Sequence, residues 1–134
     1  MNDFNHQALN LTTDKPLIFT AMSKQLFYFR MFISKFVLEQ GGVPINAFMN
    51  FDYFLLDSLD RDLVRIANNN LVKRADELWV FGPISDGVLA EIIIAKELNK
   101  PIKYFKIIES KDILEIDKIA VELENEVNSF RNKL

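Results

Sequence analysis

The sequence predicts an α/β fold, in which a parallel sheet of about four strands carries helices on both faces. Short apolar runs alternate along the chain with longer segments of helical periodicity, the pattern of repeated strand–helix units. Turn-forming residues separate these segments at Pro16, Gly41-Gly42, Gly82-Pro83 and Pro101. With 134 residues, of which 49% are apolar, the chain is long enough to build a core of its own.

The first half of the chain is predicted to hold two strands and two helices. Leu17-Ile18-Phe19 and Val43-Pro44-Ile45 are typical of short buried strands. A helix begins after the N-cap residue Ser23 and ends at Gly41-Gly42, and an aromatic-rich loop over residues 46–54 follows the second strand. The apolar positions expected to face the core are Leu26, Phe29, Ile33, Phe36 and Val37 in the first helix, and Leu56, Leu59, Leu63, Ile66 and Ala67 in a second that runs to about Ala75.

The second half repeats the same alternation. Residues 77–81 form the most strand-like segment, 86–99 a helix, and 102–105 a fourth strand. A last helix is expected over about 112–132, either covering the sheet or packing on a second subunit, with the stripe Ile116, Ile119, Leu123, Val127 and Phe130.

This element order predicts one flavodoxin-like or Rossmann-like domain over residues 1–134, with 1–15 flexible and 110–134 a C-terminal helix. The expected strand order is 2-1-3-4. Ligands of such sheets bind at the carboxyl ends of the strands, where the strand order reverses. The candidate site therefore lies between the first and third strands.

Composition excludes several functional classes. The chain has no cysteine, and its one histidine, His6, lies in a polar N-terminal stretch, so we expect no metal and no cofactor. The net charge of −3 and the scattered basic residues argue against a nucleic-acid polymer or a membrane as partner. Because the N-terminus lacks a signal-peptide pattern and no apolar run approaches the ~20 residues that span a bilayer, we expect a cytoplasmic protein.

Three segments follow the strands that border the expected crevice. They supply the candidate substrate-binding residues Thr20, Ala21, Met22 and Ser23, then Asn46 and Phe48, and finally Gly82, Ser85 and Gly87. The most informative pattern is Ser85-x-Gly87-x-x-x-Glu91, which crosses from a strand end into a helix. Helix N-terminal N–H groups and a serine hydroxyl can bind a phosphate or a sugar oxygen. The same pattern also describes an ordinary N-cap followed by a solvated glutamate.

The residues 75–82 (Ala-Asp-Glu-Leu-Trp-Val-Phe-Gly), followed by Ser85-x-Gly87-x-x-x-Glu91-x-x-x-Ala95, resemble the core signature of the nucleoside 2-deoxyribosyltransferase-like superfamily. The segments 18–22 and 42–45 are similar as well, so the resemblance covers roughly residues 16–105. The superfamily contains nucleoside deoxyribosyltransferases and deoxynucleoside 5′-monophosphate N-glycosidases. The resemblance implies N-glycosidic bond cleavage on a small nucleoside or nucleotide.

The resemblance also implies roles for individual residues. Glu91 matches the nucleophile that attacks the anomeric carbon of the sugar, and Ser85 matches the serine that contacts the 5′-phosphate in the monophosphate glycosidases. The segment 20–23 matches a stretch that lines the same pocket. The aromatic residues Phe48, Phe51, Tyr53 and Phe54 either stack on the base or cap the core. Members of the superfamily commonly form oligomers, so a homodimer or larger assembly is expected.

One position departs from the superfamily pattern. Asn68 stands where its enzymes carry an aspartate, and an amide can hydrogen-bond a sugar but cannot act as an acid or base. Either another carboxyl group, Asp86 or Asp52, replaces it, or the chain is a binding module for a nucleotide or nucleoside derivative without turnover. A flavin-binding domain is a weaker alternative, based on the hydroxyl-bearing segment 20–23.

Overall fold

A computed structural model describes residues 4–109 and 112–134, apart from the side chains of Tyr53 and Phe54. In the described part of the chain, the sheet has five strands in the order β2-β1-β3-β4-β5. The strands are β1 (Leu17–Met22), β2 (Val43–Ile45), β3 (Glu77–Phe81), β4 (Ile102–Ile108) and β5 (Asp112–Ile116). The first four pair in parallel, whereas β5 pairs antiparallel with β4. The α/β class is confirmed, but the sheet is mixed and has one strand more than predicted, which extends the expected order.

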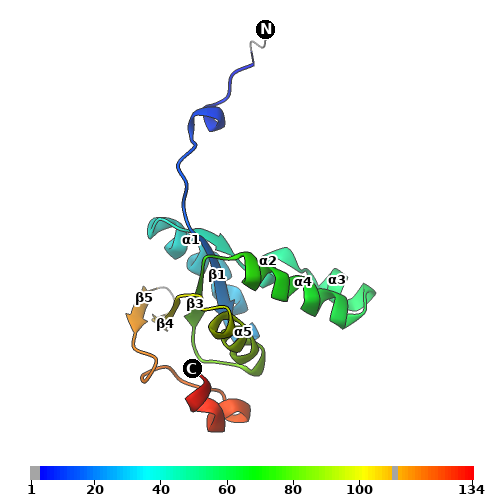
Figure 1. Ribbon diagram of the computed structural model, residues 1–134, viewed down its shortest axis with the longest axis vertical. Coiled ribbons are helices and arrows are strands. Elements are labelled where there is room, and N and C mark those ends of the chain that lie inside the picture. The colour runs from blue at the N-terminus through cyan, green and yellow to red at the C-terminus, as the bar shows by residue number, and fades with distance from the viewer. Residues whose placement is uncertain (1–3, 110–111) are drawn as a thin grey trace.

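Helices cover both faces of this sheet (Figure 1). Their bounds are η1 (Gln7–Asn10), η2 (Lys24–Phe29), α1 (Arg30–Glu39), α2 (Ala47–Asn50), α3 (Tyr53–Ser58), α4 (Arg61–Arg74), α5 (Asp86–Glu97) and η3 (Asn125–Lys133), where η marks a 3-10 helix. The helix expected after Ser23 is thus a 3-10 segment leading into a shorter α-helix, and the expected aromatic loop contains α2. Within residues 4–109 and 112–134, no helix combines the length and the apolar character that a membrane span requires.

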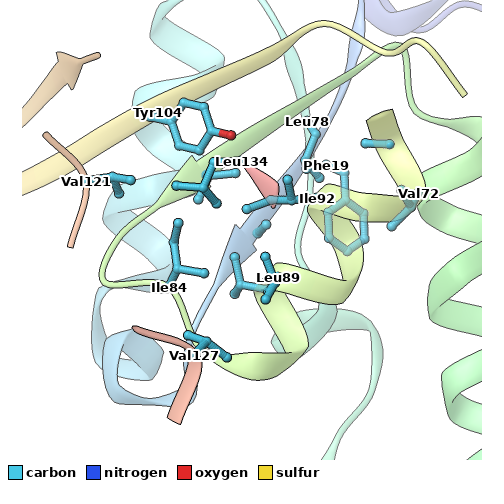
Figure 2. Packing of buried hydrophobic residues seen from close by; sticks show 14 of the residues in the cluster. Phe19, Val72, Leu78, Ile84, Leu89, Ile92, Tyr104, Val121, Val127 and Leu134 are labelled. Atoms are coloured by element: carbon cyan, nitrogen blue, oxygen red, sulfur yellow. The ribbon is translucent and has the colours of Figure 1, made fainter. Parts of the chain in front are cut away.

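The central strands β1 and β3 are buried on both faces, as parallel strands usually are. Alternate residues point to opposite sides: Phe19 and Leu78 pack with α5, whereas Ile18 and Trp79 pack with α1. Figure 2 shows the α5 side, where the aliphatic side chains of the helix meet those of the sheet and of the C-terminal segment. This packing holds the start of α5 directly beyond the ends of β1 and β3.

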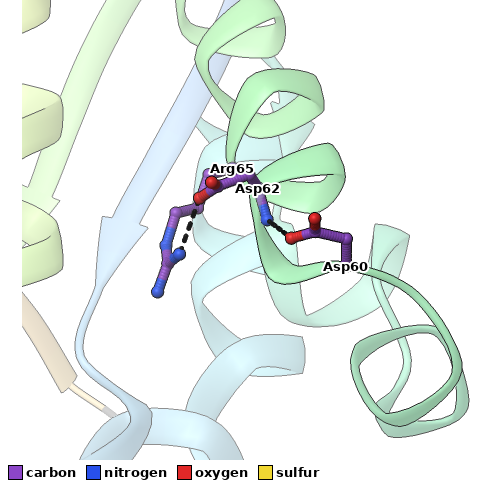
Figure 3. Close-up of polar contacts among 3 residues, drawn as sticks. All are labelled: Asp60, Asp62 and Arg65. Carbon is purple, nitrogen blue, oxygen red and sulfur yellow. Dashed lines mark hydrogen bonds and ion pairs between the residues drawn. The ribbon is translucent and has the colours of Figure 1, made fainter.

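The region predicted as one helix through Ala75 is instead two, α3 and α4. The Asp60 carboxylate accepts a hydrogen bond from the Asp62 backbone N–H at 2.9 Å and so begins a new helix (Figure 3). Arg65 then pairs with Asp62 at 2.8 Å, one turn along. Three of the apolar residues predicted to face the core are exposed instead, because α4 turns a different face to the sheet. Their exposed fractions are 45% for Leu59, 57% for Leu63 and 59% for Ile66.

The predicted C-terminal helix is also wrong. Residues 112–116 form β5 and residues 125–133 form η3, with turns between them. Pairing Asp112–Ile116 with the free edge of β4 satisfies backbone groups that a helix would have satisfied internally. The predicted stripe is split accordingly, since Val127 is buried while Ile119 and Phe130 are exposed. Residues 1–3 and 110–111 of the predicted ranges lie outside the described residues.

Candidate active site

The start of α5 positions the residues singled out by the sequence. Ser85 is the N-cap, and its Oγ accepts a hydrogen bond from the Val88 backbone N–H at 3.4 Å. The Asp86 carboxylate accepts another from the Gly87 backbone N–H at 2.7 Å. Glu91 lies about one and a half turns further along the helix. Its side chain therefore leaves α5 on the side of the crevice between α5 and α4.

Glu91 forms a hydrogen bond with Asn68 of α4. The Asn68 side-chain amide donates to Glu91 Oε2 at 2.6 Å. The Glu91 residue is only partly buried, but its carboxyl group lies among enough protein atoms to lose most of its hydration. This burial raises the pKa of Glu91 from the ordinary 4.5 to about 7, and the hydrogen bond from Asn68 lowers it in part. A carboxyl group tuned to neutral pH inside a crevice is a common feature of active sites.

The side-chain oxygen of Asn68, Oδ1, is buried and has no hydrogen-bond partner in the described part of the chain. Buried amide oxygens are normally paired, so this atom calls for an explanation. It lies beside Glu91, where a bound molecule could donate to it.

Glu91 borders two cavities. The first, which we call the polar cavity, has a volume of about 560 Å³. It is lined by Phe19, Thr20, Met22, Ser23, Lys24, Gln25, Ala47, Phe48, Ser85, Asp86, Gly87, Val88, Glu91, Glu124 and Glu126. The ends of β1 and β3, the start of α5 and the C-terminal segment thus meet around it. This is the switch-point crevice that the strand order predicts.

The second cavity, the apolar cavity, lies on the α4 side of Glu91 and has a volume of about 400 Å³. Its lining is Ala47, Phe48, Phe51, Leu56, Val64, Arg65, Asn68, Asn69, Gly87, Ala90, Glu91 and Ile94. Phe48, Gly87 and Glu91 belong to both linings, so the two cavities meet at the nucleophile candidate.

A network of buried hydrogen bonds positions residues that line the polar cavity. The Thr20 hydroxyl donates to the Ile45 carbonyl at 2.8 Å, and the Asn46 amide donates to Thr20 Oγ1 at 3.1 Å and to Met22 Sδ at 3.2 Å. Asn46 also accepts from the Phe48 backbone N–H at 2.9 Å, which caps α2. Asn46 therefore orients Thr20 and Phe48 and is not itself part of either lining.

The remaining sequence candidates lie as follows. Ser23 lines the polar cavity, and its Oγ caps η2 by accepting from the Gln25 backbone N–H at 3.0 Å. Ala21 packs into the core on the α5 side of the sheet, and Gly82 lines a different cavity, of about 210 Å³. Sequence reasoning missed Glu124 and Glu126, because their segment was interpreted as part of a helix that covers the sheet or packs on a second subunit.

Four carboxyl groups line the polar cavity, and carboxylates are common metal ligands. No group of three or more His, Cys, Asp or Glu side chains within the described ranges is arranged to hold a metal ion.

Residues 21–105 match the model of a family described as "Domain of unknown function (DUF7768)". The chain belongs to the DUF7768 family. In this DUF7768 chain, the matched range begins in β1 and ends in β4, so it includes Asn68, Ser85 and Glu91 but not Glu124.

No curated protein matches the DUF7768 chain. Among solved structures, a CMP N-glycosidase of Clostridium botulinum, BcmB, is similar at 18% sequence identity, with a TM-score of 0.48. That match covers 87% of this chain and 96% of the other.

Proposed function

We propose that the chain cleaves the N-glycosidic bond of a nucleoside or nucleotide, as an N-glycosyl hydrolase or a 2-deoxyribosyltransferase-like enzyme, with Glu91 as nucleophile. The observation that carries this proposal is the position of the Glu91 carboxyl group, buried between two cavities and held by the Asn68 amide at 2.6 Å. The sequence signature from Ala75 to Ala95 supports the same chemistry.

The contrast between the cavities supports a binding mode. The polar cavity offers the hydroxyl groups of Ser23 and Ser85 to a sugar, whereas the apolar cavity offers Phe48 and Phe51 to the flat face of a base. A nucleoside that spans both would present its anomeric carbon near Glu91, where the linings meet.

In the proposed reaction, a Glu91 oxygen attacks the anomeric carbon. The bond from that carbon to the base nitrogen breaks, and its electron pair leaves with the base, which takes up a proton from the solvent. Water then attacks the glycosyl ester, the sugar is released, and Glu91 regains its carboxylate. A second base in place of water would give transfer instead.

Two further residues have proposed roles in this reaction. The Asn68 N–H donors stabilise the ionised form of Glu91 and orient it, but cannot supply a proton to the departing base. Asp86 lines the polar cavity with one oxygen bound by the Gly87 N–H, and its second oxygen takes the proton of the attacking water.

A second candidate function is a binding module for a nucleotide or nucleoside derivative, with no turnover. The observation that favours it is Asn68, an amide at the place where the similar enzymes carry an acid. Both candidates use the same cavities and small-molecule ligand, and both leave out nucleic-acid polymers and membranes as partners.

The decisive experiment is chromatographic. The protein is incubated with ribo- and deoxyribonucleosides and their 5′-monophosphates, with and without a second free base. We expect base release or exchange, reduced about a thousandfold or more in Glu91→Gln. The matched control is Glu97→Gln, an exposed glutamate on the same helix, which should keep full activity. Thermal stabilisation by a panel member without turnover would instead favour the binding module.

We also propose that the chain forms a homodimer or larger assembly. The exposed apolar residues Leu59, Leu63 and Ile66 on and before α4 offer a surface for it, and burying them would lower the apolar area in contact with water. Light scattering at micromolar concentration should give at least twice the chain mass, and Leu63→Glu should reduce it. A monomeric mass for the unmodified protein would refute this proposal.

A further inference from the structure

The C-terminal segment is tied to the start of α5. Ile84 and Leu123 form a parallel bridge, in which the Ile84 N–H donates to the Glu122 carbonyl at 2.8 Å and the Glu124 N–H donates to the Ile84 carbonyl at 2.9 Å. Arg131 holds the preceding turn by donating to the carbonyls of residues 118, 119 and 121, at 3.2, 3.2 and 2.7 Å. The backbone of Glu124 is therefore held in place where its side chain lines the polar cavity.

One oxygen of the Glu124 carboxylate receives no hydrogen bond from the described residues. This atom, Oε2, is buried, although Glu124 lines the polar cavity. An unpaired buried carboxylate oxygen is costly, and a ligand that donates a hydrogen bond would relieve that cost. A sugar hydroxyl can donate in this way. An ionised phosphate ester carries only acceptors and the same sign of charge.

Two of the N–H groups at the start of α5 that could bind an anion are already engaged. The Gly87 N–H donates to the carboxylate of Asp86, and the Val88 N–H donates to Ser85 Oγ. A helix N-terminus attracts phosphate because its N–H groups are unpaired. Here the chain supplies its own anion at that place, so a phosphate would have to displace it.

The charges around the polar cavity also disfavour the binding of a phosphate. Among the described residues, its lining carries four carboxyl groups, those of Asp86, Glu91, Glu124 and Glu126, against the single ammonium group of Lys24. Lys24 is exposed, so water screens its attraction for an anion, whereas the Glu124 oxygen is shielded from water. The net field in the cavity therefore repels a dianion.

We propose that Glu124 is a specificity-determining residue that accepts a hydrogen bond from the 5′-hydroxyl of the sugar, the one hydroxyl that a 5′-monophosphate lacks, so that the site takes nucleosides and rejects their 5′-monophosphates. This inference rests on the proposed glycosidase function and names its substrate class. It departs from the role that the sequence resemblance implied for Ser85, because Asp86, Glu124 and Glu126 line the same cavity as Ser85.

The test compares each nucleoside with its own 5′-monophosphate, using the four common ribonucleosides, the four deoxyribonucleosides and their monophosphates. The measured quantity is the ratio of the two kcat/KM values in one protein preparation, so a fraction of misfolded protein cancels. We expect every cleaved nucleoside to be favoured at least about tenfold at low salt, with the ratio shrinking as salt screens the carboxylates.

Three variants assign the effect to residues. Glu124→Gln keeps the size of the side chain and should reduce the preference to within about threefold, and Glu126→Lys should move it further toward the monophosphate. Glu122→Gln is the matched control, because this exposed glutamate lies two residues before Glu124 and outside the polar-cavity lining. It should leave the ratio unchanged.

Each outcome has a distinct meaning. Cleavage of monophosphates as well as or better than nucleosides by the unmodified protein overturns the inference and leaves the glycosidase function standing. A nucleoside preference that Glu124→Gln leaves intact overturns the role of Glu124. No cleavage and no thermal stabilisation with any of the sixteen compounds overturns the proposed function, and this inference with it.

Discussion

The polar and apolar cavities lie on opposite sides of one carboxyl group, but their linings have opposite chemistry. Four acidic side chains and two serines face the polar cavity, whereas the described lining of the apolar cavity is mostly aromatic and aliphatic, with Arg65 and two asparagines. A uniform ligand would not match both. The difference fits the ligand of the proposed function, which has a hydroxyl-rich sugar and a flat base joined at the carbon that Glu91 would attack.

The largest expected effect is on protein stability, because the Glu91 carboxyl group is buried where the two cavities meet. Between pH 4.5 and about 7, the folded protein retains a proton that the unfolded chain has released, so its free energy of unfolding falls as pH rises through this range. Above pH 7 the free energy of unfolding stays lowered by the full cost of burying the ionised Glu91 carboxylate. Glu91→Gln should therefore be more stable than the unmodified protein at pH 8 by about 3 kcal/mol, and equally stable at pH 4.

Urea denaturation at the two pH values measures this effect, with Glu97→Gln as the exposed control that should show no such dependence. Equal stability of Glu91→Gln and unmodified protein at pH 8 would mean that the junction is open to water. The Glu91 carboxyl group would then not be a buried boundary between the polar and the apolar cavity.

The next largest effect should come from the apolar cavity alone. Phe51 lines this cavity and not the polar one, so Phe51→Ala should raise KM for a cleaved nucleoside about tenfold while changing kcat little. Met49→Ala, on the exposed side of the neighbouring α2, is the control. A fall in kcat without a change in KM would contradict the assignment of this cavity to the base.

The smallest effect concerns the boundary between the cavities. Activity should rise with pH through about 7, because Glu91 must be ionised to attack. Asn68→Leu removes the donor that favours the ionised form, so the midpoint of the pH profile should move up by about one unit. Asn70→Leu is the control, since the Asn70 side chain bonds to Ile66 and Arg74 on its own helix. An unchanged midpoint in Asn68→Leu would contradict the pairing.

The central part of the fold was predictable because its signals are local. The strands 43–45 and 77–81 were predicted with the bounds that the structure has, and the first four strands are adjacent in the expected order. Apolar runs bounded by glycine and proline define such strands without help from distant residues. Right-handed crossovers then bring Ser23, Ser85 and Glu91 to one crevice.

The C-terminal region was not predictable in the same way. Ile116, Leu123 and Val127 are spaced as a helix would space them, yet residues 112–116 pair with an open sheet edge. The choice between helix and strand there depends on β4, whose edge exists only in the folded protein. The inward face of α4 was mistaken for the same reason, since Leu63 and Ile66 fit helical periodicity but the sheet contacts Val72 instead.

The sequence by itself determined the alternating strand–helix order as far as β4, the capped start of α5 and the place of Glu91 on it, because each depends on residues close together in the chain. Only the tertiary structure decided that Asn68 donates to Glu91, that two unlike cavities meet there, and that Glu124 faces one of them. Those contacts join residues 23 or more positions apart. They follow from how whole elements pack, which local spacing does not specify.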